Sequence, residues 1–495
     1  VTARGGSLTA GDNISITASG SGAKGADGDI LLQGAAVQAG KNLDLTANRD
    51  IYLVSAQNTS LLTGSNRSSG GSIGVGIGFG GTKTGINVSA SLNQGRGHES
   101  GNGTTHTETL LNAGQRVSLT SGRDSILTGA QVSGETVKAE VGRNLLMTSE
   151  QDSDRYDSKQ QNASVGGGFT FGTMAVSTSV NLSRDKMHSN YDSVVEQTGI
   201  FAGKGGFDIT TGEHTQLNGA VIGSTAAAEN NRLDTGTLGF SDIHNQADYK
   251  VEHQSIGLST GGSIAGQFAG NMANTLLAGV NRDGHDSGTT RAAVSDGTLI
   301  VRDQEKQTQD VASLSRDAEN ANGSINQIFD KEKEQKRIQQ AQLIGEISTQ
   351  VSDIVRTQGA ISAAQDAKEK MGNISQTDRD KARADWIKAH PGQTPNEEAI
   401  TGQVYQNFYD KAFNATGLGT GGAIQQGIQA ATAAVQGLAG GDVAAALANG
   451  AAPYLAEVIG HKMGLEDNAK VVAHAIVGAA LAAAQGQNAG AGAAG

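Results

Sequence analysis

The chain has 495 residues, 71 of them glycine, and aromatic residues make up only 4% of it. Few large side chains are therefore available to fill a thick, roughly spherical core, and a thin, repetitive core suits this composition better. The net charge of −12 and the scattered lysines and arginines argue against nucleic acid as a partner. The absence of cysteine excludes disulfides, thiolate metal sites and a cysteine nucleophile.

The first residues do not have the pattern of a secretion signal. The sequence starts at Val1 in repeat-like sequence, without a basic region followed by an apolar run, so we expect an internal segment of a longer protein. No run of 18 apolar residues occurs, and the longest candidate, residues 471–484, is too short and too rich in alanine to span a bilayer alone. Any membrane role is therefore expected to be indirect or assisted.

Two stretches of the N-terminal half repeat each other without a gap. Residues 39–57 read AGKNLDLTANRDIYLVSAQ, and residues 113–131 read AGQRVSLTSGRDSILTGAQ. In both, apolar residues alternate with polar ones on either side of a polar turn, which is typical of two short strands that each bury one face. We expect the Arg-Asp pairs that begin at Arg49 and Arg123 to stabilise these turns and to pair from coil to coil.

Looser copies of the repeat begin at Ala10, Val141 and Ala202. Recurrence at this interval is typical of a solenoid, in which each coil buries its apolar face against its neighbours. We therefore predict a mainly β fold, with a right-handed parallel β-helix over residues 1–264. With roughly 20 residues per coil and about 4.8 Å between stacked strands, the β-helix would be at most about 60 Å long, and insertions would shorten it.

Glycine-rich segments of another kind lie between the copies. In residues 70–93 and 163–183 small residues alternate with apolar ones, and residues 253–263 look like a shortened third version. We interpret them as two-stranded β-hairpins that leave the β-helix, in which glycine permits close approach of another backbone. Their exposed edges favour pairing with a partner sheet, so interaction rather than catalysis is the predicted use.

The periodicity changes in the C-terminal half. We predict a polar linker over residues 265–300 and an α-helical region over residues 301–416. Apolar residues from Ile325 to Ile361 are spaced largely by three and four, which indicates a long amphipathic helix or a helical pair. The mixed-sign run at residues 331–337 most simply forms the solvated face of this helix.

Two prolines, Pro391 and Pro395, interrupt the helical region, and Asn396 is placed to cap a following helix. Residues 417–495 are rich in alanine and glycine, and we expect small-residue helices whose backbones pack closely there. Membrane helices also pack in this way, but compact soluble helical hairpins are the interpretation we favour.

Motifs that would indicate catalysis or metal binding are weak. The glycines of residues 74–81 precede an alternating strand and not the helix that a phosphate-binding loop must open. The acidic residues 152–157 lack the central glycine and terminal glutamate of a calcium loop, and we expect a solvated loop. His461 and His474 are too far apart to share one helical turn, and no nucleophile elbow occurs. We predict no catalytic, cofactor-binding or metal-binding residues and no enzyme.

The repeat at residues 39–53 and the glycine-rich insertions resemble the second repeat region of filamentous haemagglutinin exoproteins, and more closely the CdiA family of contact-dependent growth inhibition toxins. Residues 297–347 and 422–459 are similar to the segment just before the pretoxin region of that family, so residues 417–495 would belong to an incomplete pretoxin region. These long strings are more specific than the repeat alone. The resemblance covers nearly the whole chain.

The resemblance implies a division of labour. In that family a first repeat region forms a filament and a receptor-binding region caps it, whereas the second repeat region is deployed onto the outer membrane of the target cell. Residues 1–495 depart from the family pattern, because we recognise among them no secretion signal, transport domain, cytotoxic C-terminus or Val-Glu-Asn-Asn boundary motif. Residues 465–468 are only superficially similar to that motif and lie too early.

We therefore predict the delivery and cell-surface engagement part of a two-partner-secreted toxin. The implied partners are the outer membrane of the target cell or one of its proteins, and an outer-membrane transporter during export, but no nucleic acid and no cofactor. The implied location is the surface of a Gram-negative bacterium or the secreted state, with delivery to the target envelope. The alternative is a haemagglutinin-like adhesin that presents a binding surface to host cells.

Overall fold

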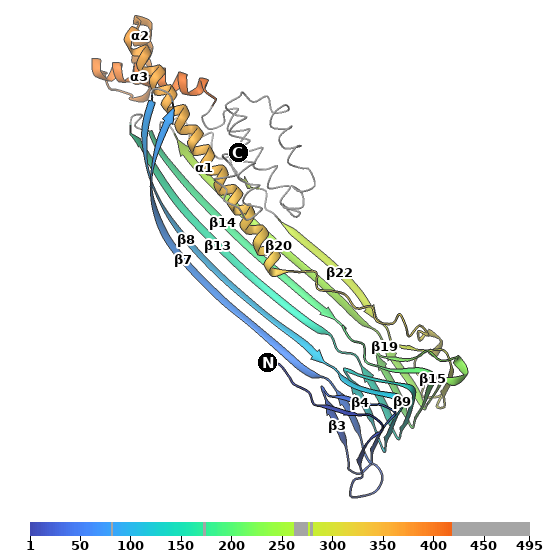
Figure 1. Cartoon of the computed structure of the whole chain (residues 1–495). Helices are drawn as coiled ribbons and strands as arrows, with labels where there is room; N and C mark the ends of the chain where they lie inside the picture. The colour runs from blue at the N-terminus through green and yellow to red at the C-terminus, as the bar shows by residue number, and fades with distance from the viewer. Residues whose placement is uncertain (81–82, 172–174, 262–275, 278–280, 418–495) are drawn as a thin grey trace.

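The chain forms a β-helix, a long antiparallel sheet that projects from it and a helical part that lies along this sheet (Figure 1). The computed structural model describes residues 1–80, 83–171, 175–261, 276–277 and 281–417. Among these residues no helix combines the length and apolar character needed to cross a bilayer.

Parallel strands of two sheets build the β-helix, as the repeats predict. Sheet A provides two sides of each coil and sheet B provides the third, and seven sheet A strands follow one another in the order of the chain. Seven coils about 4.8 Å apart give a length of about 30 Å. Sheet A contains β1 (Ser7–Ala10), β2 (Ile14–Ala18), β4 (Ala36–Ala39), β5 (Asn42–Ala47), β9 (Thr109–Ser121), β11 (Ala130–Val141), β15 (Gly199–Thr211), β17 (Val221–Ser224), β18 (Arg232–Thr235), β23 (Ala293–Val294) and β24 (Thr298–Val301). Sheet B contains β3 (Ile30–Gln33), β6 (Ile51–Val54), β10 (Ser125–Thr128), β12 (Asn144–Thr148), β16 (His214–Asn218) and β19 (Thr237–Ser241).

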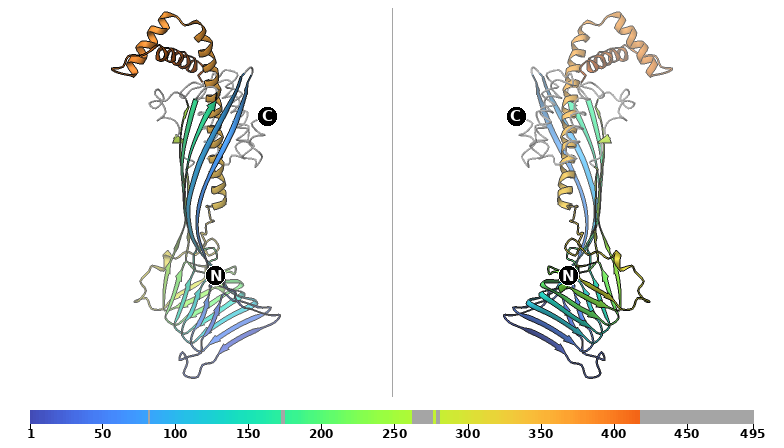
Figure 2. Two further views of the ribbon diagram at one scale, coloured as in Figure 1. Left: turned by 90° about the vertical axis from the view of Figure 1, so that its left-hand side faces the viewer. Right: turned by 90° about the vertical axis from the view of Figure 1, so that its right-hand side faces the viewer.

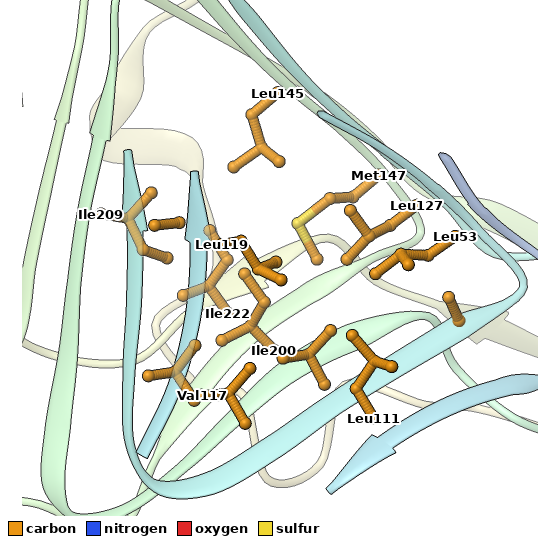
Figure 3. Packing of buried hydrophobic residues seen from close by; sticks show 14 of the residues in the cluster. Leu53, Leu111, Val117, Leu119, Leu127, Leu145, Met147, Ile200, Ile209 and Ile222 are labelled. Carbon is orange, nitrogen blue, oxygen red and sulfur yellow. The ribbon is translucent and has the colours of Figure 1, made fainter. Parts of the chain in front are cut away.

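The core of the β-helix is a stack of aliphatic side chains. Leu43 of β5 lies beside Val117 of β9, and Leu53 of β6 lies beside Leu127 of β10, because equivalent positions of successive coils pair in register. All four side chains are fully buried, and Figure 3 shows such residues converging from the sides of the coil. Alternate residues point inward along each strand, so the period of two in the repeat defines this core.

The recurrence of Ala-Gly in the repeat has a steric cause. A Cβ atom added to Gly40 would lie 1.9 Å from the carbonyl oxygen of Gly11 in the coil below, and one added to Gly114 would lie 2.2 Å from that of Gly40. Side chains at this bend would therefore prevent neighbouring coils from stacking at strand distance.

Arginine and aspartate connect successive coils at the Arg-Asp turns, as predicted. Arg49 Nε donates to Asp29 Oδ1 at 2.7 Å, and Arg143 Nε donates to Asp124 Oδ1 at 2.8 Å, so each arginine pairs with an aspartate of the preceding coil. The carboxylate of Asp50 accepts the backbone N–H of Asp124 at 2.9 Å. These contacts satisfy backbone donors at the turn and fix the register of the stack.

At one corner of the β-helix, coils that turn directly into the next coil alternate with coils that carry a long insertion. After β3, β10 and β16 the chain turns directly into the next coil with a left-handed glycine, at Gly34, Gly129 and Gly219. After β6, β12 and β19 it leaves the β-helix and returns only after a long insertion. An insertion therefore follows every second coil, at a spacing of about 9.6 Å, which is the width of two paired strands.

The insertions pair with one another and form sheet C. Its strands are β7 (Ala56–Gly80), β8 (Lys83–Thr107), β13 (Asp152–Phe171), β14 (Ala175–Ser193), β20 (Ile243–Gly261), β21 (Leu276–Leu277) and β22 (Arg282–Thr290). The predicted hairpins at residues 70–93 and 163–183 are the outer parts of two much longer hairpins. Their edges do not stay free, because β8 pairs with β13 and β14 pairs with β20 in antiparallel register.

The structure differs from the predicted linker at residues 265–300. Residues 282–290 form β22, which pairs with β20, and β23 and β24 add a further coil to the β-helix. The polar composition misled the prediction because β22 has only one side chain that is fully buried, Thr290. A polar sequence is a stable strand when its backbone completes the edge of an existing sheet.

The helical part begins at Lys331, later than predicted. It comprises α1 (Lys331–Lys370), the 3₁₀ turn η4 (Met371–Asn373), α2 (Gln376–Ala389) and α3 (Glu397–Ala415). Two further 3₁₀ turns precede it, η1 (Ala228–Asn230) between β17 and β18 and η3 (Val311–Ser313) after β24. The predicted cap is confirmed, because Asn396 Oδ1 accepts the backbone N–H of Ala399 at 2.8 Å. The prediction for residues 417–495 lies outside the described residues, apart from Gly417.

Candidate interaction surface

Buried threonines close the necks of the first two hairpins. Thr109 follows β8, and its Oγ1 donates to the carbonyl oxygen of Val54, where the first hairpin leaves the β-helix, at 2.6 Å. Thr198 donates in the same way to the carbonyl oxygen of Thr148 at 2.9 Å. Each hydroxyl therefore joins the departing and returning chains, which orients the hairpin relative to the coils.

The register of sheet C separates its side chains into two faces. Tyr156 on β13 lies opposite Gly101 on β8 and Ser189 on β14, and Ser189 lies opposite Tyr249 on β20. Directly opposed residues of antiparallel strands point to the same face. We call the face that carries Tyr156 and Tyr249 the helix face, because α1 lies against it, and the opposite one the outer face (Figures 1 and 2).

Aromatic packing joins the helix face to the start of α1. Phe329 stacks against Tyr156 with ring centroids 5.5 Å apart and lies 5.8 Å from the ring of Tyr249. Met187 and Ile338 belong to the same buried cluster. Ring pairs of this kind add about 0.5–1.5 kcal/mol beyond their buried area, so they hold α1 in place on the sheet.

Charged groups reinforce the same contact. Lys331 Nζ lies 2.6 Å from Glu99 Oε2 and 5.2 Å from the centre of the Tyr156 ring, and Tyr156 donates to Glu99 at 2.9 Å. The ammonium group of Lys331 lowers the pKa of Glu99 below its usual value. Gln342 Nε2 reaches Asp185 Oδ2 at 3.1 Å, so polar contacts continue along the helix.

The outer face of sheet C exposes large apolar side chains toward the hairpin tips. Leu92 and Val165 are a directly opposed pair, and the register places the other members on the same face. Their exposed fractions are far above those expected for a sheet that is covered by a second layer. The members are Ile73 (82%), Val75 (66%), Leu92 (72%), Val165 (55%) and Leu182 (49%).

The outer face becomes basic and polar toward the β-helix. A shallow depression of about 270 Å³ lies there, lined by lysine, histidine and acidic side chains. Lys250 Nζ pairs with Glu252 at 2.6 Å, and His188 Nδ1 contacts Asp157 at 2.6 Å. Apart from the exposed Leu61 on the edge strand β7, the face thus has an apolar outer part and a charged inner part along the same strands.

An acidic cluster lies where the hairpins join the β-helix. Burial raises the pKa of Glu108 to about 8, and the neighbouring carboxylates of Glu196, Glu150 and Asp152 raise it further. Glu108 Oε2 is buried without a hydrogen-bond partner. Within the described ranges no group of three or more potential ligands is arranged to hold a metal ion. The raised pKa of Glu108 makes this cluster a source of pH dependence.

Sequence reasoning located some of these features and missed others. The glycine-rich residues 74–81 continue strand β7 up to Gly80, as expected for a strand and not for a phosphate-binding loop. The expected solvated loop at residues 152–157 is wrong, because these residues begin β13 and Tyr156 is buried against the helical part. His461 and His474 lie outside the described residues.

The neck threonines and the two-faced character of sheet C were also missed. Only the alternation of charged and apolar residues at every second position could have indicated the outer face. The pairing of β8 with β13 was needed to bring the separate stretches together.

Comparisons with known proteins agree with this architecture. Residues 1–163 match the family of the hemagglutinin repeat. The chain is 56% identical to the 16S rRNA endonuclease CdiA of Enterobacter cloacae, over 100% of this chain and 14% of that protein. It is 53% identical to the deoxyribonuclease CdiA of Yersinia pseudotuberculosis, over 99% of this chain and 45% of that protein. It is 50% identical to the tRNA nuclease CdiA of Escherichia coli O6:K15:H31, over 100% of this chain and 15% of that protein.

The stacked coils and the repeat match define a filamentous haemagglutinin-type protein. The similarity along the whole chain then makes the assignment more specific, and the chain belongs to the CdiA-type proteins of this family. It spans 14–45% of the length of the three relatives described above. The nuclease activities in their names are those of the relatives.

Proposed function

We propose that this chain is the delivery segment of a contact-dependent growth inhibition toxin and that it engages the outer membrane of a target cell through sheet C. The observation that carries the proposal is the exposed apolar part of the outer face. A contiguous apolar surface of this kind is typical of an interaction site with a membrane or a protein.

The shape of the molecule supports this role. β7 has 25 residues, which corresponds to about 85 Å of extended chain. Figure 2 shows that the hairpin tips stand far from the β-helix. The β-helix would then act as the base, and the apolar outer face would be the part that first meets another cell.

The remaining properties of the proposal follow from the family. Surface display or secretion by a Gram-negative bacterium would require an outer-membrane transporter during export. The segment itself would be non-enzymatic, and it would carry toxic cargo without acting on the cargo's substrate. Nucleic acid would not be a partner, in accordance with the acidic net charge of −12.

The test replaces apolar side chains of the outer face in a complete CdiA protein that carries this segment. The variant Ile73→Asp, Leu92→Asp, Val165→Asp should be exported normally but should kill target cells at least about tenfold less, because an aspartate placed in the hydrocarbon of a bilayer costs roughly 2 kcal/mol or more on insertion scales. The matched control, Leu8→Asp, Leu31→Asp, Leu110→Asp, changes exposed leucines of the β-helix and should kill normally.

The same experiment separates the proposal from the adhesin alternative. Undiminished killing by the outer-face variant, with normal export, would contradict a role of sheet C in delivery. An adhesin would show a different pattern: loss of attachment to host cells and no toxin-dependent killing by the unmodified protein.

A further inference from the structure

Three arginines form one transverse row on the outer face of sheet C. Arg67 on β7 lies directly opposite Arg96 on β8, and the row continues through Gln161 on β13 to Arg184 on β14. With strands about 4.8 Å apart, the row spans about 14 Å. The three guanidinium groups therefore leave the sheet at one height along the strands.

These arginines form no ion pair within the described part of the chain, and the electrostatic contact of Arg184 with Glu252 contributes less to the lowered pKa of that carboxylate than Lys250 does. No ion pair or hydrogen bond engages the side chains of Arg67, Arg96 or Arg184, and Nε of Arg184 is buried without a partner. Directly opposed like charges destabilise a strand pair, so the Arg67–Arg96 pairing is unfavourable in the isolated protein. This contrasts with the turns of the β-helix, where Arg49 and Arg143 each bind an aspartate.

Nearby acidic residues are already engaged. Glu252 and Asp157, on the same face, are paired with Lys250 and His188. The next row toward the β-helix adds Lys159, which is opposed to another lysine. An excess of unpaired cations on a protein of net charge −12 indicates that an anion from another molecule binds here.

The position of the row identifies the kind of anion. Leu182 lies two residues from Arg184 toward the hairpin tips, and the exposed Leu92 and Val165 lie one row farther. A face that changes from apolar to cationic within two rows matches a membrane, in which phosphate groups lie between the acyl chains and water. A nucleic acid would place charged phosphates against the apolar rows as well.

We propose that Arg67, Arg96 and Arg184 bind the phosphate groups of membrane lipids and set the depth to which the outer face of sheet C enters the lipid. Guanidinium groups bind phosphate with two parallel hydrogen bonds. Their three-carbon stems can lie along the apolar surface while the charged ends reach the headgroups. The inference rests on the proposed function, because it requires the outer face to meet a membrane.

The first test measures binding of the full chain to vesicles of phosphatidylcholine with and without 30% phosphatidylglycerol. The variant Arg67→Gln, Arg96→Gln, Arg184→Gln should bind anionic vesicles at least about tenfold more weakly. The matched control, Arg4→Gln, Lys138→Gln, Arg291→Gln, removes the same charge from exposed sites on the β-helix and should bind within about twofold of the unmodified chain. Circular dichroism should show that both variants fold.

The second test measures depth. The chain contains no cysteine, so a fluorescent label on Ile73→Cys reports this position alone, and lipids brominated at different depths quench it. The unmodified arginine row should place the label among the acyl chains, and the triple glutamine variant should place it nearer the headgroups.

The outcomes distinguish the inference from the proposed function. If the unmodified chain and the triple glutamine variant bind vesicles equally well and to equal depth, the proposed role of the arginines is wrong, whereas membrane engagement by the outer face still holds. Binding of inorganic phosphate that depends on the three arginines, together with unchanged vesicle binding by the glutamine variant, would indicate a free-anion site and would also overturn it. Failure of the unmodified chain to bind any vesicle would overturn both.

Discussion

Single carboxylates carry much of the register between coils. Asp124 accepts from Arg143 Nε at 2.8 Å and from the backbone N–H of Asn144 at 3.1 Å, so one side chain joins two coils by charge-assisted hydrogen bonds. The guanidinium of Arg143 holds the pKa of Asp124 below its usual value. A buried carboxylate with this many partners is costly to remove, because its partners are left without an acceptor.

The change Asp124→Ala should therefore lower the free energy of unfolding by about 2–4 kcal/mol. Urea denaturation followed by circular dichroism measures the effect. The lowered pKa means that the ionised carboxylate contributes stability at neutral pH, and this contribution should be lost as the pH falls below about 4. The variant and the unmodified chain should then become similar in stability.

Asp44→Ala is the matched control for this change. Asp44 also pairs with an arginine of the next coil, Arg116, at 3.1 Å, but both side chains are more than a third exposed. Its loss should cost less than about 1 kcal/mol. If the two substitutions lower the free energy of unfolding equally, the contacts of Asp124 at the turn do not contribute more to the stacking of the coils than an exposed ion pair does.

Glu108 should make stability depend on pH in the opposite direction. Its folded-state pKa of about 8 lies above the value of the unfolded chain. The folded state therefore holds a proton that the unfolded state releases, and stability is lost as the pH rises from about 5 to about 8.

The change Glu108→Gln should remove this loss. Its melting temperature should exceed that of the unmodified chain by about 2 °C or more at pH 8.5 and should match it at pH 5. Glu229→Gln, at an exposed site in η1, should leave the pH profile unchanged. A melting temperature for Glu108→Gln that stays below that of the unmodified chain at pH 8.5 would contradict the burial of this carboxyl.

At the scale of elements, the coil spacing determines sheet C. A two-stranded hairpin leaves after every second coil, so the hairpins stand side by side at strand distance and pair without gaps. Replacing residues 149–197 by one glycine, as at Gly129, should keep the β-helix intact but leave about 14 Å between β8 and β20. Amide hydrogen exchange should become faster in those two strands and remain slow in β9. Unchanged protection of β8 and β20 would contradict this account.

The attachment of α1 can be tested at Phe329. The change Phe329→Ala removes ring contacts with Tyr156 and Tyr249, and it should weaken the docking of α1 by about 1–3 kcal/mol. Faster amide exchange in the first turns of α1, with no change in the β-helix, would be the signature. Lys333→Ala, at an exposed site of the same turn, should have no such effect.

The same scale explains how much the sequence could predict. The coils could be predicted from Leu43, Leu45 and their counterparts, because each coil strand has its own alternation of apolar and polar residues and is followed by its own turn. The pairing of β8 with β13 could not be predicted in this way, because it depends on the number of coils between two insertions and not on local composition. Residues 152–157 are rich in aspartate, and residues 282–290 are rich in aspartate and glycine. Both residue types disfavour strands, and only this long-range pairing makes these segments strands.

At the scale of the whole molecule, sheet C has two different faces. On the helix face α1 lies against the sheet, whereas the outer face exposes apolar side chains beyond a row of arginines (Figure 1). The family assignment could be predicted from long similar strings in the sequence. The outer face could not, because its residues come from strands far apart along the chain.

Site-directed labels on β7 test the membrane account most directly. Nitroxide labels on single cysteines at Ser72, Ile73, Gly74 and Val75, in the presence of anionic vesicles, report whether each position contacts lipid or water. The account predicts a period of two, with lipid contact at 73 and 75 and none at 72 and 74, because only odd positions of β7 belong to the outer face. Water contact at all four positions, or no alternation, would contradict it.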